Sequence, residues 1–167
     1  INVGYYRQDF STLNFDDTVH ESLEEAIRLA GEDPVEEYLR TIAAGFLITR
    51  DMVHAKIRTL SEGQKGLVAF ARLVLQKPGL LILDEPTNGL DPMGIAEIRE
   101  IIKKIAADGK TIIRASHLLD EVQKVCTHFA VLKRGSLMHI GPVDDVGKGE
   151  EVVEVQAYHD DLGVLLQ

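Results

Sequence analysis

Hydrophobic and polar residues follow two different periods along this chain, and each change of period marks a predicted element. Short apolar runs indicate strands, and apolar residues spaced three and four apart indicate helices. Strands are predicted at residues 2–7, 80–83 and 111–115, and helices after Thr18, Asp33, Ser61, Asp91 and Ser116-His117. Because strands alternate with helices, as they do in parallel sheets, the predicted fold class is α/β.

Capping residues locate the starts of the helices. Thr18 with Glu21, and Ser61 with Gln64, have the sequence form of a capping box, in which two side chains satisfy the first free N–H groups of a helix. Asp33-Pro34 predicts a further helix with proline at its first position.

The end of the chain is predicted to hold a hairpin and then a linker. Residues 129–132 and 136–140 have the pattern of two strands around a turn, and Gly141-Pro142 predicts a break after them. Residues 147–149 are glycine-rich and predict a linker. The alternation over 153–157 then predicts a strand of a further element that is unfinished where the sequence stops.

Composition and charge narrow the class of protein. The 167 residues are 45% hydrophobic and 27% charged, which is enough for the core of one soluble globular domain. The net charge of −9 argues against a broad nucleic-acid-binding face, and the single cysteine, Cys126, excludes an internal disulfide. No stretch approaches the ~20 apolar residues of a membrane-spanning helix, so we expect no direct membrane insertion and any membrane contact to come through a partner.

Two carboxylates end the apolar run at residues 80–83. A run of this kind is typical of a buried parallel strand, which would place Asp84 and Glu85 at the carboxyl end of a sheet, where phosphates and magnesium bind. Asp84 would then hold a metal and Glu85 a water molecule. The alternative is a strand that runs into an N-capped turn without chemistry.

The predicted start of the helix after Ser61 is a second candidate site. Helix N-termini with free N–H groups attract phosphate, Ser61 adds a hydroxyl, and Gly63 leaves the first turn open to a ligand. The alternative is that the capping box only starts a helix.

In their order along the chain, these motifs resemble those of ABC-type ATPases, and the resemblance covers nearly all of the sequence. It implies a P-loop NTPase fold with a mostly parallel sheet and a helical subdomain. It also implies a role for each motif: a signature motif at Ser61–Gln64, the Walker B aspartate at Asp84, the catalytic carboxylate at Glu85, the D-loop at Asp91, the switch histidine at His117 and the Q-loop glutamine at Gln8.

The activity implied by the resemblance is hydrolysis of ATP with Mg²⁺. Glu85 and His117 would be catalytic, and Asp84 and Gln8 would contact the metal. The implied nucleotide-binding residues are Gln8, Ser61, Gly63, Gln64 and Asp91. The implied partner is a second ABC ATPase domain, arranged head to tail, so that each chain contributes to two sites.

Three of these residues have an ordinary structural alternative when they are considered alone. His117 could be a satisfied polar residue at the start of a helix, Gln8 a loop cap and Asp91 a helix N-cap. Their place in the series of motifs favours the functional interpretation.

Two departures from the family pattern affect the expected activity. Glu62 puts an extra carboxylate where the family commonly has glycine, which suits the helix dipole but opposes a nucleotide. A P-loop of the form Gly-x-x-x-x-Gly-Lys-Ser/Thr is not found, and Gly109-Lys110-Thr111 follows a predicted helix instead of preceding one. We therefore expect a fragment of an ABC-type ATP hydrolase that does not hydrolyse ATP alone.

The resemblance divides the chain into four expected parts: a Q-loop strand at 1–9, a helical subdomain with the signature motif at 10–76, the Walker B, D-loop and switch part at 77–146, and the unfinished element at 147–167. The first half resembles the soluble ABC-F group, and the second half resembles exporter-type transporter ATPase subunits. One hypothesis is a hybrid joined near residue 88.

Three functional hypotheses follow from the resemblance. The chain is an ATPase subunit of an ABC transporter, cytoplasmic or peripheral to the inner face of the membrane, with a membrane-spanning subunit as partner. Alternatively it is a translation factor of the ABC-F type that binds the ribosome, or an engineered, non-catalytic protein that keeps the ABC fold.

Overall fold

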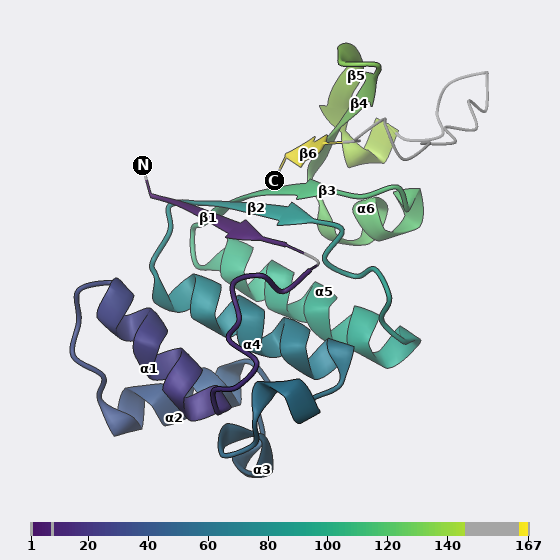
Figure 1. Ribbon diagram of the computed structural model, residues 1–167. Coiled ribbons are helices and arrows are strands. Elements are labelled where there is room, and N and C mark those ends of the chain that lie inside the picture. The colour runs from purple at the N-terminus through teal and green to yellow at the C-terminus, as the bar shows by residue number, and fades with distance from the viewer. Residues whose placement is uncertain (1, 8, 146–163, 167) are drawn as a thin grey trace.

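The computed structural model describes residues 2–7, 9–145 and 164–166, and its centre is a mostly parallel sheet (Figure 1). The strands of the sheet lie in the order β1-β2-β3-β6, with β6 antiparallel to β3 and the others parallel. They are β1 (Val3–Tyr6), β2 (Leu80–Asp84), β3 (Thr111–Ala115) and β6 (Val164–Leu166). The predicted α/β class with a mostly parallel sheet is confirmed.

Helices cover one face of this sheet. Figure 1 shows α4 and α5 along that face, with α1, α2 and α3 packed farther out beyond α4. The helices are α1 (Val19–Leu29), α2 (Glu36–Gly45), α3 (Arg50–Val53), α4 (Glu62–Leu75), α5 (Pro92–Ala107) and α6 (Leu119–Val125), with short 3₁₀ turns η1 (Ile57–Thr59) and η2 (Val143–Asp145). None of the helices in the described ranges has the length and apolar character needed to cross a lipid bilayer.

A two-stranded hairpin lies on the other side of the sheet from α4 and α5 (Figure 1). It pairs β4 (His128–Lys133) with β5 (Ser136–Pro142) in antiparallel fashion, as the sequence predicts. The predicted break at Gly141-Pro142 is wrong, because Pro142 pairs with His128 at the end of β5. Proline is tolerated there, since the end of an edge strand does not require its missing N–H group.

The core forms where alternate residues of the strands meet the apolar faces of α4 and α5. Leu81 and Leu83 of β2 point to this side together with Phe70 of α4 and Ile98 and Ile102 of α5, and all five side chains are almost fully buried. A second contact joins β1 to α4, because the ring of Tyr6 stacks on Phe70 with 4.5 Å between the ring centroids. The end of β1 is therefore fixed against α4.

Both predicted capping boxes are confirmed. The Thr18 hydroxyl accepts a hydrogen bond from the Glu21 N–H (3.2 Å), and the Glu21 carboxylate accepts one from the Thr18 N–H (2.6 Å). Ser61 and Gln64 make the same reciprocal pair at the start of α4, with distances of 3.2 and 3.0 Å.

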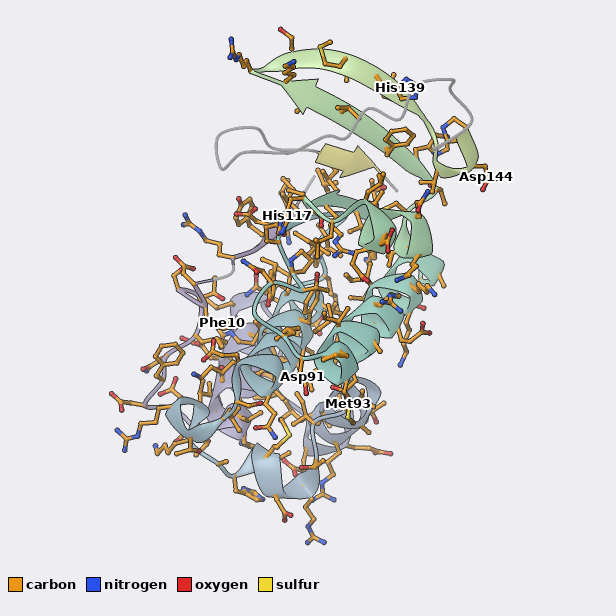
Figure 2. All side chains as sticks on the ribbon, turned by 90° about the vertical axis from the view of Figure 1, so that its right-hand side faces the viewer. Phe10, Asp91, Met93, His117, His139 and Asp144 are labelled. Carbon is orange, nitrogen blue, oxygen red and sulfur yellow. The ribbon has the colours of Figure 1, made fainter. Side chains whose placement is uncertain are left out.

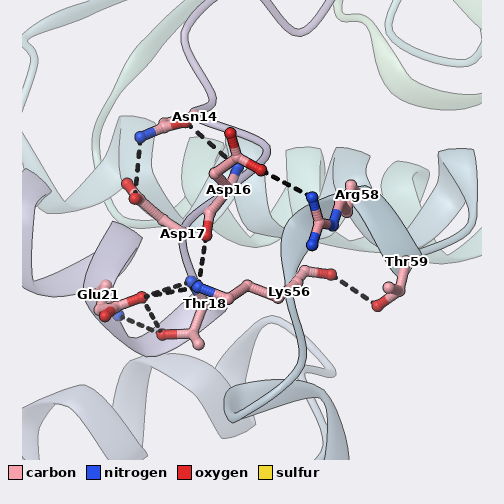
Figure 3. A network of polar contacts seen from close by, with 8 residues as sticks. All are labelled: Asn14, Asp16, Asp17, Thr18, Glu21, Lys56, Arg58 and Thr59. Carbon is pink, nitrogen blue, oxygen red and sulfur yellow. Dashed lines mark hydrogen bonds and ion pairs between the residues drawn. The ribbon is translucent and has the colours of Figure 1, made fainter.

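The loop before α1 is tied to the segment before α4 by the polar network in Figure 3. The carboxylate of Asp16 pairs with Arg58 at 2.9 Å, and Lys56 Nζ donates to the Asp16 carbonyl at 2.5 Å. The main chains of Thr18 and Lys56 also form a β-bridge. The starts of α1 and α4 are therefore held in a fixed relation to each other.

Some predictions about the helical part and the end of the chain were wrong or lie outside the description. Helix α2 starts at Glu36, two residues later than Asp33-Pro34 predicts, because Val35 is still extended and acts as the N-cap. The short helix α3 and turn η1 were not predicted. The predicted linker at 147–149 and strand at 153–157 lie outside the described residues.

Candidate functional site

An acidic pair ends the central strand of the three parallel strands. Asp84 is the last residue of β2 and lies opposite Ala115 of β3. Glu85 follows in the left-handed backbone region, with φ of 43°, a conformation that is costly for a residue other than glycine. The Glu85 N–H donates to the Ala115 carbonyl at 3.2 Å. This position at the carboxyl end of a parallel strand is the one predicted from the sequence.

His117 meets Glu85 at the same edge of the sheet. Its Nδ1 lies 2.8 Å from Glu85 Oε1, and its backbone N–H donates to the same oxygen at 3.1 Å. The His117 side chain is 49% exposed and the Glu85 side chain 23%. When the proton is on Nδ1, the imidazole donates to the carboxylate and leaves Nε2 as a hydrogen-bond acceptor.

This edge of the sheet fits a magnesium ion that is shared with phosphate. Mg²⁺ in phosphate sites takes one or two carboxylates and completes its shell with phosphate oxygens and water. Asp84, the last residue of β2, supplies one such carboxylate. Within the described ranges, no group of three or more His, Cys, Asp or Glu residues forms a closed metal cage. A single carboxylate that is completed by phosphate oxygens and water suits a magnesium ion bound together with a phosphate.

The N-terminus of α4 is the second candidate site. Ser61 is the N-cap, and its hydroxyl and the Gln64 side chain are engaged with each other. A Cβ atom added at Gly63 would meet only Leu90 Cδ2 at 3.8 Å and Ser61 Oγ at 4.0 Å, so the first turn has no crowded neighbour. The extra carboxylate of Glu62 pairs with Lys65 at 2.8 Å, which offsets part of its repulsion toward a phosphate.

Asp91 lies next to this helix start. Its carboxylate accepts a hydrogen bond from the Gly94 N–H at 2.9 Å and so caps α5. The neighbouring Leu90 reaches the space beside Gly63. Asp91 therefore acts as a helix N-cap, which is the structural alternative considered for it. Its neighbour Leu90 lies beside Gly63, so Asp91 is also close to the expected signature residues at the start of α4.

The predicted site residues form two separate groups. Asp84, Glu85 and His117 share the edge of the sheet, while Ser61, Gly63, Gln64 and Asp91 gather where α4 and α5 begin. Figure 2 shows His117 and Asp91 well apart on the molecule. The remaining candidate, Gln8, lies outside the described residues.

One buried polar contact close to the acidic pair was not predicted from the sequence. Arg114 of β3 is only 1% exposed, and its Nη2 donates to Thr87 Oγ1 at 2.9 Å. Burial lowers the pKa of Arg114, and the nearby acidic groups Cys126, Glu121 and Glu85 act the other way. The burial of Arg114 could have been predicted from the sequence. Side chains alternate between the two faces of a strand, so Arg114 shares the buried face of Ile112.

Comparison with known proteins identifies one family. Residues 1–88, just over half of the 167, match the family model described as ABC transporter. An uncharacterized ABC transporter ATP-binding protein of Bacillus subtilis, YhcH, is 45% identical over 96 residues, which are 57% of this chain and 32% of YhcH. The energy-coupling factor transporter ATP-binding protein EcfA2 of Acetivibrio thermocellus is 33% identical over 143 residues, which are 84% of this chain and 51% of EcfA2.

A solved structure shares the fold. The structure of cbiO1 from Clostridium perfringens, described as part of the ABC transporter complex cbiONQ, matches 90% of this chain and 61% of its own with a TM-score of 0.75 and 31% identity. The alignments to YhcH and EcfA2 show that the chain spans about a third to a half of the length of these curated relatives. By its family match and its fold, the chain belongs to the ABC transporter family of ATP-binding proteins.

Proposed function

We propose that this chain contributes the water-activating half of an ATP-hydrolysing site in an ABC transporter. The contact between Glu85 and His117 at the carboxyl end of the parallel sheet carries this proposal. Glu85 polarises the attacking water, His117 contacts the terminal phosphate, and Asp84 and Gln8 hold Mg²⁺. Bound Mg²⁺ would neutralise the charge of the phosphates.

The second group of residues serves a different nucleotide. Ser61, Gly63, Gln64 and Asp91 lie at the starts of α4 and α5, and Asp91 lies away from His117 (Figure 2). In a head-to-tail pair, the N–H groups of α4 and the Ser61 hydroxyl face the phosphates bound by the partner domain. This division of labour explains why two polar groups lie apart in one chain.

The proposed activity requires a P-loop that these 167 residues do not contain. Gly109-Lys110-Thr111 cannot act as one, because Gly109, with φ of 81°, follows the end of α5, and β3 begins at Thr111. A P-loop has the opposite order, with the strand first and the helix after it. We propose that a segment other than these residues supplies the phosphate-binding lysine.

The proposed partners are a second ABC ATPase domain and a membrane-spanning subunit, with the chain on the cytoplasmic side of the membrane. Support comes from relatives described as transporter ATP-binding proteins and from cbiO1, described as part of a transporter complex. The alternative is an ABC-F-type factor, which the first half of the sequence resembles. Co-sedimentation of the chain with ribosomes would support this alternative. The alignment to EcfA2 over 143 residues favours the transporter subunit. A natural gene whose sequence runs unbroken through residue 88 would contradict the hypothesis of a hybrid joined near that residue.

The test joins this chain to the P-loop segment of YhcH and measures ATP hydrolysis. We expect hydrolysis by the joined protein, and Glu85→Gln should lower its turnover by about 100-fold or more. Asp108→Asn, which changes an exposed carboxylate at the end of α5, is the matched control and should leave turnover unchanged. A folded joined protein without hydrolysis, or full turnover in Glu85→Gln, would contradict the proposal.

Calorimetry on the chain alone tests the dependence on a P-loop. We expect no binding heat with MgATP, because the acidic pair alone does not hold a triphosphate. Saturable binding would show that the chain cradles a nucleotide without a P-loop.

A further inference from the structure

We propose that Arg114 is a positioning residue, which holds the turn after β2 so that the Glu85 carboxylate faces His117. This inference rests on the proposed function, because it takes Glu85 as the group that polarises water. It assigns a role to a buried cation that touches neither of the two candidate sites directly.

The turn is anchored to β3 at two places. At its start, the Glu85 N–H donates to the Ala115 carbonyl at 3.2 Å, and the turn closes with a hydrogen bond of 3.0 Å from the Asn88 N–H to the Glu85 carbonyl. Between these ends, the Thr87 hydroxyl accepts from Arg114 at 2.9 Å. Adjacent residues of one strand thus hold the turn, Ala115 through its main chain and Arg114 through its side chain.

The buried environment of Arg114 does not favour an arginine if only the stability of the fold matters. Its Nε and Nη1 atoms are buried and have no hydrogen-bond partner among the described residues. A buried charge with unsatisfied donors costs free energy, and an apolar side chain of similar size fills such a place at lower cost. What the guanidinium supplies, and an apolar residue does not, is a donor for Thr87 and a positive charge near Glu85 and Glu121.

The backbone of Glu85 has a strained conformation that needs surrounding contacts to hold it. Its φ of 43° is strained for a glutamate, and strained residues persist only where the surrounding contacts fix them. If the Thr87 anchor is lost, the turn can relax toward ordinary φ values. The carboxylate would then leave the His117 N–H, from which it now accepts at 3.1 Å.

Hydrogen exchange at the His117 amide measures this directly, by NMR on the ¹⁵N-labelled chain without nucleotide. We expect Arg114→Met and Thr87→Val each to raise the exchange rate of this amide by about tenfold, because its acceptor becomes mobile. Thr87→Ser keeps the hydroxyl and should stay within about twofold of the original rate. The double variant should exchange no faster than either single variant, since all three lose the same bond.

Arg72→Met is the matched control, because Arg72 is also buried, also has an unpartnered Nε and lies in α4. It should leave His117 exchange unchanged. Unchanged exchange in both Arg114→Met and Thr87→Val would overturn the proposal and leave Arg114 a packing residue. If Arg114→Met does not fold, the comparison of Thr87→Val with Thr87→Ser still decides. Since no nucleotide is present, this failure is distinct from the absence of ATP hydrolysis that would contradict the proposed function.

Discussion

Two glycines at the interface between β1 and α4 differ sharply in the space around them. A Cβ atom at Gly4 would lie 2.8 Å from Leu73 Cδ1 and 3.1 Å from Pro78 Cγ, whereas a Cβ atom at Gly66 would lie 3.4 Å from Tyr6 Oη. Gly4→Ala should therefore lower the free energy of unfolding by about 1–3 kcal/mol through overpacking. Gly66→Ala removes a glycine from the interior of a helix and should raise it by about 1 kcal/mol.

Urea unfolding followed by circular dichroism measures both changes. The two variants make the same chemical change on facing elements, so each controls for the other. A shift in the same direction for both would show that the packing between β1 and α4 differs from the one described.

At the scale of residues, sequence reasoning placed the acidic pair but not the contacts that hold it. The apolar run into Asp84 and Glu85 predicts their position at the end of a strand, because that depends only on local pattern. The bond between Arg114 and Thr87 depends on which strands are neighbours and on their register, which the pattern of one strand does not contain. The meeting of Glu85 with His117 was predicted only through the family resemblance.

The two capping boxes are equivalent as helix starts but differ in their proposed roles. Thr18→Ala and Ser61→Ala each remove the hydroxyl that accepts from the N3 N–H, and each should cost about 1 kcal/mol of stability. Only Ser61→Ala should also weaken ATP hydrolysis by the joined protein, because only α4 faces a nucleotide in the proposed dimer. Thermal unfolding and turnover of both variants test this. Equal turnover in the two would contradict the role of Ser61.

The first capping box also makes the stability of α1 depend on pH. Hydrogen bonds from the Thr18 N–H and hydroxyl hold the pKa of Glu21 below its ordinary value of 4.5. A folded-state pKa that is lowered means that the unfolded chain binds the proton more readily. The contribution of Glu21 is therefore fully present above its ordinary pKa and is lost as the pH falls through the lower folded-state value.

Thermal unfolding from about pH 6 to about pH 3 tests this dependence in the original chain and in Glu21→Gln. The stability difference between them should shrink as the pH falls. Glu37→Gln, a carboxylate in the first turn of α2, is the matched control. A difference for Glu21→Gln that stays constant with pH would contradict the prediction.

At the scale of elements, the strands and capped helices were predictable because their signals are local. The alternation of β3 and the capping boxes of α1 and α4 needed no tertiary information. The start of α2 was not predictable from Asp33-Pro34, since Val35 stays extended and exposed where the chain turns into the helix. The short α3 and η1 are too brief to show a period. Thr49 caps α3, and η1 contains Arg58, which pairs with the distant Asp16.

At the scale of the whole molecule, the hydrophobic core contains residues from both sides of position 76, where one predicted part of the chain ends and the next begins. One hydrophobic cluster runs from Tyr6 and Leu23 through Phe70 to Leu83 and Ile102. The division into parts at 10–76 and 77–146 therefore stays a prediction about motifs. Unfolding experiments can show whether those parts are also independent in stability.

We expect the described chain to unfold as one unit. Arg72 of α4 ties α1 to this core, because its guanidinium donates to the Ser22 carbonyl, to Ser22 Oγ at 2.9 Å and to Glu25 at 2.9 Å. Arg72→Met should lower the free energy of unfolding by about 2 kcal/mol, since the buried Ser22 acceptors lose a charged donor. The transition should stay single, because the apolar contacts between α1 and α4 remain.

The two observables that decide this are helical circular dichroism and the fluorescence of Tyr6, which stacks on Phe70. The other three tyrosines, Tyr5, Tyr38 and Tyr158, are replaced by phenylalanine in both proteins so that only Tyr6 emits. Coincident urea transitions in the original chain and in Arg72→Met mean that α1, α4 and the sheet form one cooperative structure. If the helical signal were lost first, the helical part would be a separate unit of stability. The continuous cluster of buried side chains would then be insufficient to couple it to the sheet that carries Glu85 and His117.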